Sequence, residues 1–330
     1  MGFQFKYDEG VPQTKIQQLL HAITEAISNG VLKEGELMPS VNQLSKSGGV
    51  SRDTVFKAYS ILKQRSIISS TPTKGYFVNS VSFRVMMLLD DFSAFKEQLY
   101  TSFRSNLPDN YAVDLLFHHY NPDVFDQLVQ NSLGRYSMYV VMNIKHSRLE
   151  KVVRKIDPNK LLILDMGTPD GDDISYITQD FQAGPIACLK QVVDRLQSYR
   201  QFNLVFPAST PHPVEFVKAF DAFCKEHKLK HQLIDDLSKR TVQPGQAYLT
   251  IKEEDLVYLL KSCKAQGVKT GSDLGLIAYN DTPLKELVGA GITVISADFA
   301  EMGAKAARFV VSKEKIFEVL APKLILRGSL

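Results

Sequence analysis

The sequence predicts an α/β protein in which a small helical domain with a β-hairpin precedes a larger, two-lobed domain built on parallel sheets. Three observations lead to this prediction: the spacing of apolar residues in residues 1–78, the alternation of strand-like and helix-like segments after residue 80, and the length of 330 residues. That length is about twice the size of a typical domain, so two or three domains are expected.

Two helices are predicted at the start of the chain. The first follows Pro12 and ends near Gly30, because apolar residues recur there at steps of three and four: Ile16, Leu19, Leu20, Ile23 and Ile27. The second runs from Ser40 to Lys46, and Ser40 can form a capping box with Gln43 at its first turn.

A third helix and a hairpin complete the N-terminal domain. Gly48 and Gly49 break the chain, and Ser51 can cap a helix that follows. The buried positions of that helix would be Val55, Ala58, Tyr59 and Leu62, and the exposed ones Arg52, Asp53, Thr54 and Lys57. Two short β-prone runs around residues 71–75 then predict a hairpin with Lys74 at its tip.

Three helices followed by a hairpin are the layout of a winged helix-turn-helix domain, whose third helix enters the major groove of DNA. Arg52 can then reach guanine or phosphate, Thr54 can contact phosphate or a thymine methyl group, and Lys74 can approach the minor groove. Residues 1–78 hold nine basic and six acidic residues. Their excess of three positive charges equals the net charge of +3 of the whole chain. The alternative interpretation is a helical bundle with solvated cations.

The stretch LKEGELMPSVNQLSKSGGVSRDTVFKAYSILKQRSIISSTPTKGYFV closely resembles the DNA-binding domain of the GntR family of bacterial repressors. The motifs that carry the resemblance are LKEGELMPS, VSRDTV and GYFV, in the family's order. The resemblance and the exposed positions together predict DNA contacts from Ser40, Asn42, Ser51, Arg52, Thr54, Lys57, Lys74 and Gly75. Family members usually have arginine where this chain has Asn42, which implies an amide hydrogen bond at that position.

The chain after residue 80 alternates between β-prone runs and amphipathic segments such as PVEFVKAFDAFCKEH. This alternation predicts parallel sheets with helices on both faces. The number of runs exceeds what one small sheet needs, so two lobes are expected: RVMMLLDD, YAVDLLFHH, YSMYVVMNI, KLLILDMG, FNLVFPA, QAYLTI, LGLIAYND and ITVISAD.

Polar residues follow the ends of these runs, where ligands bind in parallel α/β sheets. Carboxylates, amides, imidazoles and an aromatic ring suit a hydroxyl-rich ligand: Asp90, Asp91, Phe92, His118, His119, Asn143, Asp165, Asn280 and Asp281. No run precedes a glycine-rich phosphate loop, which disfavours nucleotide hydrolysis. Adjacent histidines on a strand face opposite sides, which disfavours a metal site. We expect no metal or other cofactor.

The order of these segments resembles the LacI-type effector domain, which is itself similar to periplasmic sugar-binding proteins. The resemblance is clearest in VKTGSDLGLIAYNDTPLKEL, GITVISADFAEMGAKAA and PKLILRGSL, and YITQDFQAG is similar to the segment that crosses between lobes. It implies a type I periplasmic-binding-protein-like fold for residues 79–330. Lobe 1 would comprise about residues 83–181 and 296–315, and lobe 2 about residues 182–295 and 320–330.

The resemblance also implies ligand contacts from Asp91, Phe92, Phe95, Asp180, Asn280 and Asp281. Asn280 replaces the aspartate that is usual in the family. The family often has a sugar-binding arginine in the region of STPHPVEFVKAF, and His212 or Glu215 would take its role here. His119 and Asn143, at the ends of their runs, complete the predicted ligand site.

Together these resemblances imply a ligand-responsive transcription regulator, a repressor that binds palindromic operator DNA as a homodimer and senses a monosaccharide such as arabinose or fucose. The alternative is an effector domain derived from an enzyme, of the aminotransferase type, that senses a non-sugar metabolite. Such a domain needs a longer chain and a lysine in a cofactor-binding context. We therefore expect a protein that is not an enzyme.

The N-terminus has no apolar leader and no run approaches the length of a membrane span, so a cytoplasmic protein without membrane contact is expected. The three cysteines lie far apart and show no metal-ligand spacing, so we expect them to be packing residues: Cys188, Cys224 and Cys263.

Overall fold

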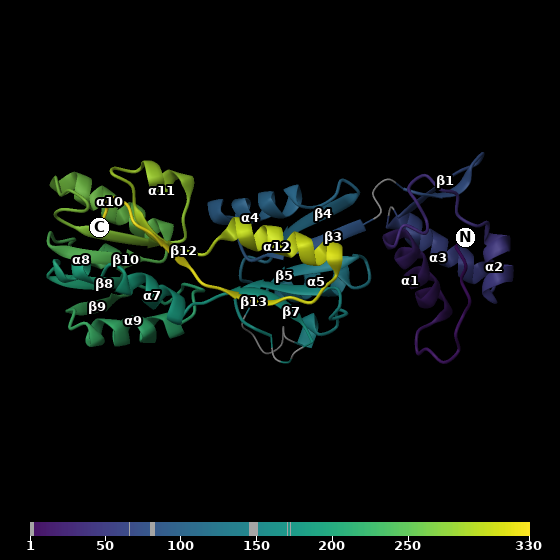
Figure 1. The fold of residues 1–330 in the computed structure, drawn as a ribbon, viewed down its shortest axis with the longest axis horizontal. Helices are drawn as coiled ribbons and strands as arrows, with labels where there is room; N and C mark the ends of the chain where they lie inside the picture. The colour runs from purple at the N-terminus through teal and green to yellow at the C-terminus, as the bar shows by residue number, and fades with distance from the viewer. Residues whose placement is uncertain (1–2, 66, 80–82, 145–150, 170, 172) are drawn as a thin grey trace.

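The computed structural model describes residues 3–65, 67–79, 83–144, 151–169, 171 and 173–330. It places three bodies in a row (Figure 1). The N-terminal domain lies at one end, a first α/β lobe lies in the middle, and a second α/β lobe lies at the far end. Among the described helices, none has the length and apolar character needed to cross a membrane.

The N-terminal domain has the predicted helices and hairpin. Ser40 caps the second helix in a capping box with Gln43, as predicted, although this helix ends at Gly48 rather than at Lys46. The four positions predicted to be buried in the third helix are all buried. The elements are α1 (Lys15–Ser28), α2 (Val41–Gly48), α3 (Arg52–Gln64), β1 (Ile68–Thr71) and β2 (Gly75–Val78), with β1 and β2 antiparallel.

The first lobe is built on a parallel sheet with strand order β13-β7-β6-β5-β3-β4 in the described residues. Helices α4 and α12 cover one face and α5 covers the other. A Cβ atom at Gly303 would collide with the carbonyl oxygen of Leu99, so only glycine lets α12 pack this closely on α4. The elements are β3 (Phe83–Leu89), α4 (Ala94–Ser105), β4 (Tyr111–Phe117), α5 (Pro122–Ser132), β5 (Met138–Met142), β6 (Leu161–Asp165), β7 (Ser175–Gln179), α12 (Phe299–Ser312) and β13 (Phe317–Leu320).

The second lobe contains a sheet with strand order β14-β12-β11-β10-β8-β9, parallel except for the antiparallel edge strand β14. Apolar clusters fill both faces of this sheet, and all three cysteines are free and buried in the lobe. The elements are α7 (Ala183–Lys190), α8 (Val193–Gln197), β8 (Gln201–Val205), α9 (Glu215–Glu226), β9 (His231–Ile234), the 3₁₀ helix η1 (Leu237–Lys239), β10 (Gln246–Thr250), α10 (Glu253–Gln266), β11 (Gly275–Tyr279), α11 (Pro283–Leu287), β12 (Thr293–Ser296) and β14 (Lys323–Ile325).

The chain crosses between the lobes after β7, after β12 and after β13, as far as the described elements trace it. The crossing segments lie side by side between the lobes in Figure 1. All eight β-prone runs named from the sequence form strands, and the predicted fold class is confirmed. Four further strands, β7, β9, β13 and β14, were not predicted as strands.

Candidate nucleic-acid interface and ligand pocket

The turn between α2 and α3 presents the first turn of α3 to solvent. Gly49 adopts the left-handed conformation with φ of 67°, which ends α2 and lets the chain reverse. The Ser51 side chain then caps α3: its hydroxyl accepts a 3.1 Å hydrogen bond from the Thr54 backbone and lies 2.8 Å from the Thr54 hydroxyl. The cap leaves the side chain of Arg52 exposed at the start of the helix.

The charges on α3 are partly paired. Asp53 forms an ion pair with Lys57 one turn later, with 2.8 Å between the lysine nitrogen and the carboxylate. Both side chains are exposed, so the pair contributes little to stability. It does place a negative charge beside the cations that would meet DNA. Asp53 therefore weakens the positive field of this helix.

Tyr59 and the hairpin hold α3 in place. The Tyr59 hydroxyl donates a 2.7 Å hydrogen bond to the carbonyl of Pro39, just before α2. Its ring lies edge-on to Tyr76 of β2, with 4.7 Å between centroids. Burial is the main reason that the pKa of Tyr59 lies above its ordinary value, so the hydroxyl remains a donor. At the wing tip, Thr71 accepts a hydrogen bond from the Lys74 backbone and Lys74 is exposed.

The eight residues predicted to contact DNA all belong to α2, α3, their caps and the wing. Two of them, Ser40 and Ser51, use their side chains as helix caps. Phe56 was not among the predicted residues, yet its side chain is 56% exposed on α3 one turn after Arg52. Helical spacing puts Arg52 and Phe56 on one face, which was the available signal. DNA contact by these residues remains a prediction.

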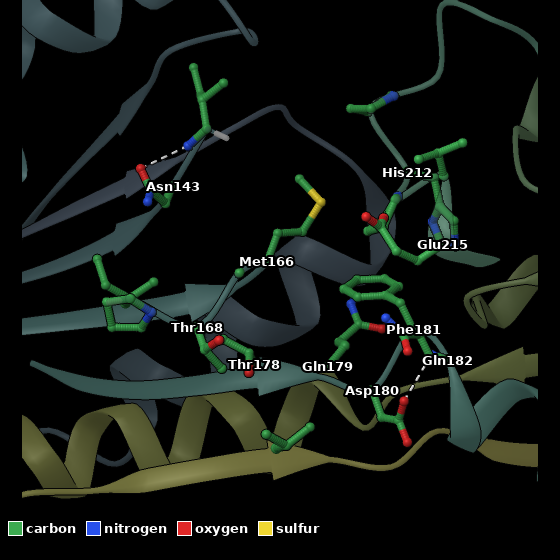
Figure 2. Close-up of a pocket in the computed structure, with 18 of the residues that line it drawn as sticks. Asn143, Met166, Thr168, Thr178, Gln179, Asp180, Phe181, Gln182, His212 and Glu215 are labelled. Carbon is green, nitrogen blue, oxygen red and sulfur yellow. Dashed lines mark hydrogen bonds between the residues drawn. The ribbon is translucent and has the colours of Figure 1, made fainter. Parts of the chain in front are cut away.

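A pocket of about 1010 Å³ lies where the two lobes meet (Figure 2). Its walls come from the ends of β5, β6 and β7 in the first lobe, from the crossing that leads into α7, and from the loop before α9 in the second lobe. The labelled residues in Figure 2 are Asn143, Met166, Thr168, Thr178, Gln179, Asp180, Phe181, Gln182, His212 and Glu215. Amides, hydroxyls and aromatic rings dominate this set.

His212 is an uncharged polar group in an aromatic setting. Its ring lies edge-on to Phe181, Phe216 and Tyr279, with centroid distances of 5.0, 5.3 and 4.6 Å. Burial lowers its pKa to about 3, so the imidazole is neutral near pH 7. Its Nε2 atom is buried and has no hydrogen-bond partner among the described residues. A ligand hydroxyl could supply that partner.

Gln179 gives the pocket a second unpartnered atom. Its side-chain amide donates to Asp165 at the end of β6, while its Oε1 atom is buried without a partner in the described part of the chain. Burial and, secondarily, the nearby Asp90 raise the pKa of Asp165 to about 6, and Lys96 opposes the rise. Asp165 also adopts a left-handed backbone with φ of 69°.

Asp90 is the centre of a polar hydrogen-bond network in the first lobe. Its carboxylate accepts hydrogen bonds from Lys96 and, at 2.6 Å, from the hydroxyl of Tyr120, which lines the pocket. Asp90 and Lys96 are almost fully buried, so each charge is compensated by the other. The network thus fixes the ring of Tyr120 at the edge of the pocket.

Three of the nine residues predicted to bind a ligand line this pocket: Asn143, Asp180 and His212. The carboxylate of Asp180, however, caps α7 by accepting from the backbones of residues 182, 183 and 184. Glu215, the sequence-based alternative to His212, also lines the pocket.

The other six predicted residues lie outside its lining. Asp281 is held by Arg327 through two 2.8 Å hydrogen bonds, and the Phe95 ring packs against Phe299 of α12. Asp91 lies 3.4 Å from His119, at the exposed end of the first lobe beside Phe92. Asn280 has a left-handed backbone conformation, and its carbonyl oxygen accepts a hydrogen bond from the side-chain nitrogen of Lys285. Ligand contact by any of the nine remains a prediction.

The sequence interpretation missed most of the pocket. Met166, Thr168, Thr178 and Gln179 lie at the ends of β6 and β7. Met166 and Thr168 follow the predicted strand β6, so the rule that ligands lie beyond strand ends applied to them, but the sequence interpretation did not select them. Thr178 and Gln179 belong to β7, which the sequence interpretation treats only as a crossing segment, so recognition of β7 as a strand was the missing signal for these two residues.

Two protein families match separate parts of this chain. Residues 15–78 match the gntR family of bacterial regulatory proteins, and residues 195–330 match the periplasmic binding protein-like domain. The uncharacterised HTH-type transcriptional regulator YjiR of Escherichia coli (strain K12) is 42% identical over 65 residues, which cover 20% of this chain and 14% of that protein. YcxD, another uncharacterised HTH-type transcriptional regulator, from Bacillus subtilis (strain 168), is 38% identical over 64 residues, which cover 19% of this chain and 14% of YcxD. The matched part therefore spans only 14% of either relative.

Solved structures match most of this chain. The trehalose repressor from Escherichia coli superposes with a TM-score of 0.62 at 16% identity, covering 74% of this chain and 100% of its own. A LacI family transcriptional regulator from Lactobacillus casei with bound sucrose gives 0.61 at 16% identity, with 75% and 99% covered. The transcriptional regulator CelR in complex with cellobiose gives 0.61 at 13% identity, with 89% and 100% covered. The chain therefore joins a GntR-type helix-turn-helix domain to a periplasmic-binding-protein-like domain with the fold of LacI-family regulators.

Proposed function

We propose that this protein is a transcription regulator that binds operator DNA through α3 and the β1–β2 wing and responds to a neutral sugar held between its lobes. The observation that carries this proposal is the presence in one chain of an exposed, capped α3 and a polar pocket between two lobes. The curated relatives that match the first part are named as transcription regulators.

The DNA contacts follow from the start of α3. Arg52 is the exposed cation of the first turn, and free backbone N–H groups at a helix start attract phosphate oxygens. Thr54 and Lys57 lie in the first two turns of α3, and Lys74 would extend the contact with DNA from the wing. Contacts of this kind with the phosphate backbone of DNA supply affinity, whereas Arg52 and the amide of Asn42 would supply base recognition.

The pocket suits a sugar because its polar groups are mainly uncharged donors and acceptors. Phe181 offers a ring face, and His212 and Gln179 carry unpartnered buried atoms within the described structure. Solved structures of the same fold hold bound sucrose in one case and cellobiose in another. Arabinose and fucose, the compounds implied by the sequence resemblance, are the first monosaccharides to test.

A homodimer would place two α3 helices on a palindromic operator. Leu284 and Leu287 of α11 support a dimer, because their side chains are 71% and 77% exposed, more than any other large apolar side chain described. Such apolar exposure is typical of a surface that a partner covers. We propose that the dimer acts in the cytoplasm as a repressor and that sugar binding changes its lobe arrangement.

The direct test is a thermal-shift screen of the full chain against neutral mono- and disaccharides, followed by selection of DNA sites from a random pool. We expect at least one sugar to raise the melting temperature, because a ligand at a hundredfold its Kd stabilises the folded state by about 2.7 kcal/mol. We also expect the selected DNA to be palindromic. Absence of any stabilising sugar would refute the sensing function, and absence of any selected site would refute the DNA-binding function.

A further inference from the structure

We infer that the pocket holds a saccharide of two linked units rather than a single sugar ring. The inference rests on the proposed sugar-sensing function and deepens it by naming the size of the ligand. Its basis is the arrangement of polar groups on two sides of Met166 in one pocket (Figure 2).

The pocket is larger than one sugar ring needs. Its volume of about 1010 Å³ lies at the upper end of the range of roughly 300–1,000 Å³ in which drug-sized ligands bind. A monosaccharide is much smaller than such a ligand and would touch only part of the lining. A two-unit saccharide can contact both lobes at once.

One polar end belongs to the first lobe. Asn143 follows β5 and Thr168 follows β6, and Figure 2 shows both on the same side of Met166. The Asn143 side-chain oxygen already accepts a 2.9 Å hydrogen bond from the Ile144 backbone. Its NH₂ group is therefore the part that can donate to a ligand hydroxyl.

The other polar end belongs to the second lobe. His212 and Glu215 lie on the opposite side of Met166, beside the ring of Phe181. The carboxylate of Glu215 can accept from two neighbouring hydroxyls, and a ring face such as that of Phe181 packs against the C–H face of a sugar. We assign the more tightly held unit to this end.

The middle of the pocket separates the two ends. Met166 contributes an apolar surface there, and Gln179 contributes the buried Oε1 atom that lacks a partner among the described residues. An unpartnered buried acceptor is costly unless a ligand donates to it. A hydroxyl close to the glycosidic bond of a two-unit ligand can do so while C–H groups cover Met166.

Isothermal titration calorimetry with matched pairs of sugars tests this inference on the full chain. The pairs are arabinobiose with arabinose, xylobiose with xylose, and maltose and cellobiose with glucose. We expect the best disaccharide to bind at least about tenfold more tightly than its own monosaccharide, because it gains the contacts of the second end.

Variants at the two ends make the test specific. Asn143→Ala and Thr168→Val should each weaken the disaccharide about five- to tenfold and leave the monosaccharide unchanged, whereas Glu215→Gln should weaken both. Thr168 is exposed, so Thr168→Val reports on this end even if Asn143→Ala lowers the melting temperature.

Three results would overturn the inference while leaving sugar sensing intact. The first is a monosaccharide that binds as tightly as every disaccharide containing it. The second is a disaccharide whose affinity is unchanged by Asn143→Ala and Thr168→Val, and the third is a monosaccharide that these variants weaken as much as the disaccharide. If no sugar of the panel binds, the sugar-sensing proposal fails and the inference fails with it.

Discussion

The Tyr59 hydroxyl donates a 2.7 Å hydrogen bond to the carbonyl of Pro39, and this bond ties α3 to the chain that enters α2. The ring of Tyr59 is fully buried and lies edge-on to Tyr76 of the wing. One side chain thus joins α3 to the chain before α2 and to the wing, and α3 and the wing are the elements for which we propose DNA contact.

Removal of this hydroxyl should loosen the N-terminal domain. We expect Tyr59→Phe to lower the free energy of unfolding by about 1 kcal/mol, because the ring stays buried but the Pro39 carbonyl loses its donor. Urea unfolding followed by far-ultraviolet circular dichroism measures the change. The control is Tyr258→Phe, whose hydroxyl makes only a 3.4 Å exposed contact with Arg240. Equal losses of unfolding free energy in the two variants would show that the hydrogen bond to Pro39 does not stabilise the N-terminal domain.

The cations of α3 and the wing should govern the salt dependence of DNA binding. Arg52→Ala and Lys74→Ala should each weaken operator binding and reduce the slope of log Kd against log salt by about one for each phosphate that the variant no longer neutralises. Fluorescence anisotropy at several salt concentrations gives the slope. Lys261→Ala, an exposed lysine on α10 in the second lobe, is the control and should leave the slope as in the wild type.

Asp53 should oppose DNA binding. Asp53→Asn removes the carboxylate that pairs with Lys57 at 2.8 Å, so Lys57 becomes available to a phosphate. We expect severalfold tighter binding at low salt, and little change in the melting temperature because an exposed ion pair contributes little to stability. Weaker binding by Asp53→Asn would instead show that this carboxylate accepts a hydrogen bond from a base.

Most interior strands were predictable from the sequence, although β7 was not, and of the four edge strands in the described sheets of the two lobes only β4 was predicted. Runs such as LLIL at the start of β6 are continuously apolar because both faces of a parallel sheet are covered. The edge strand β13 alternates, with Phe317 and Val319 about half exposed, and β14 has only three residues. Such short half-exposed segments carry little apolar signal. Continuous apolar runs therefore predicted most of the strands, whereas the short edge strands β9, β13 and β14 required the three-dimensional structure.

The candidate pocket was predictable only in part. Asn143 follows a recognised strand, so the strand-end rule reached it, whereas His212 was reached only through the resemblance to the LacI-type effector domain. Gln179 was missed because β7 was not predicted as a strand and because its hydrogen bond with Asp165 depends on the pairing of β6 with β7. Phe92 follows a recognised strand as well, yet it lies outside the pocket lining. Which strand ends face the second lobe depends on strand order, which a single sequence does not contain.

Asp165 should make stability depend on pH. Burial raises its pKa to about 6 from 3.8, so the folded state holds this proton more tightly than the unfolded state. Its contribution is therefore most favourable below pH 3.8 and is lost as pH rises through about 6. Asp165→Asn keeps the acceptor for Gln179 and tolerates the left-handed backbone. We expect this variant to gain stability over the wild type between pH 4 and pH 6, as measured by urea unfolding at each pH.

A stability difference between Asp165→Asn and the wild type that stays constant across that interval would show that the carboxyl has an ordinary pKa. Asp173→Asn, which changes an exposed aspartate of the same lobe, is the control and should not reproduce the gain.

The apolar surface of α11 should hold the dimer together. Leu284→Glu with Leu287→Glu should yield monomers, because charged side chains would be buried at the interface. Light scattering after size-exclusion chromatography measures the mass. Val257→Glu, at a half-exposed position on α10, is the control and should leave the dimer intact. A wild type that is already monomeric, or a double variant that remains dimeric, would exclude α11 as the contact.

Sugar in the interlobe pocket should change how strongly the N-terminal domain binds DNA. The measurement is the Kd for a selected operator by fluorescence anisotropy, with and without a saturating concentration of the sugar found by the thermal-shift screen. We expect a change of at least about fivefold, which Glu215→Gln reverses at the same sugar concentration without altering the sugar-free Kd. If calorimetry shows that the sugar saturates the pocket and the operator Kd is nevertheless the same with and without sugar, the result would contradict the coupling of the two domains.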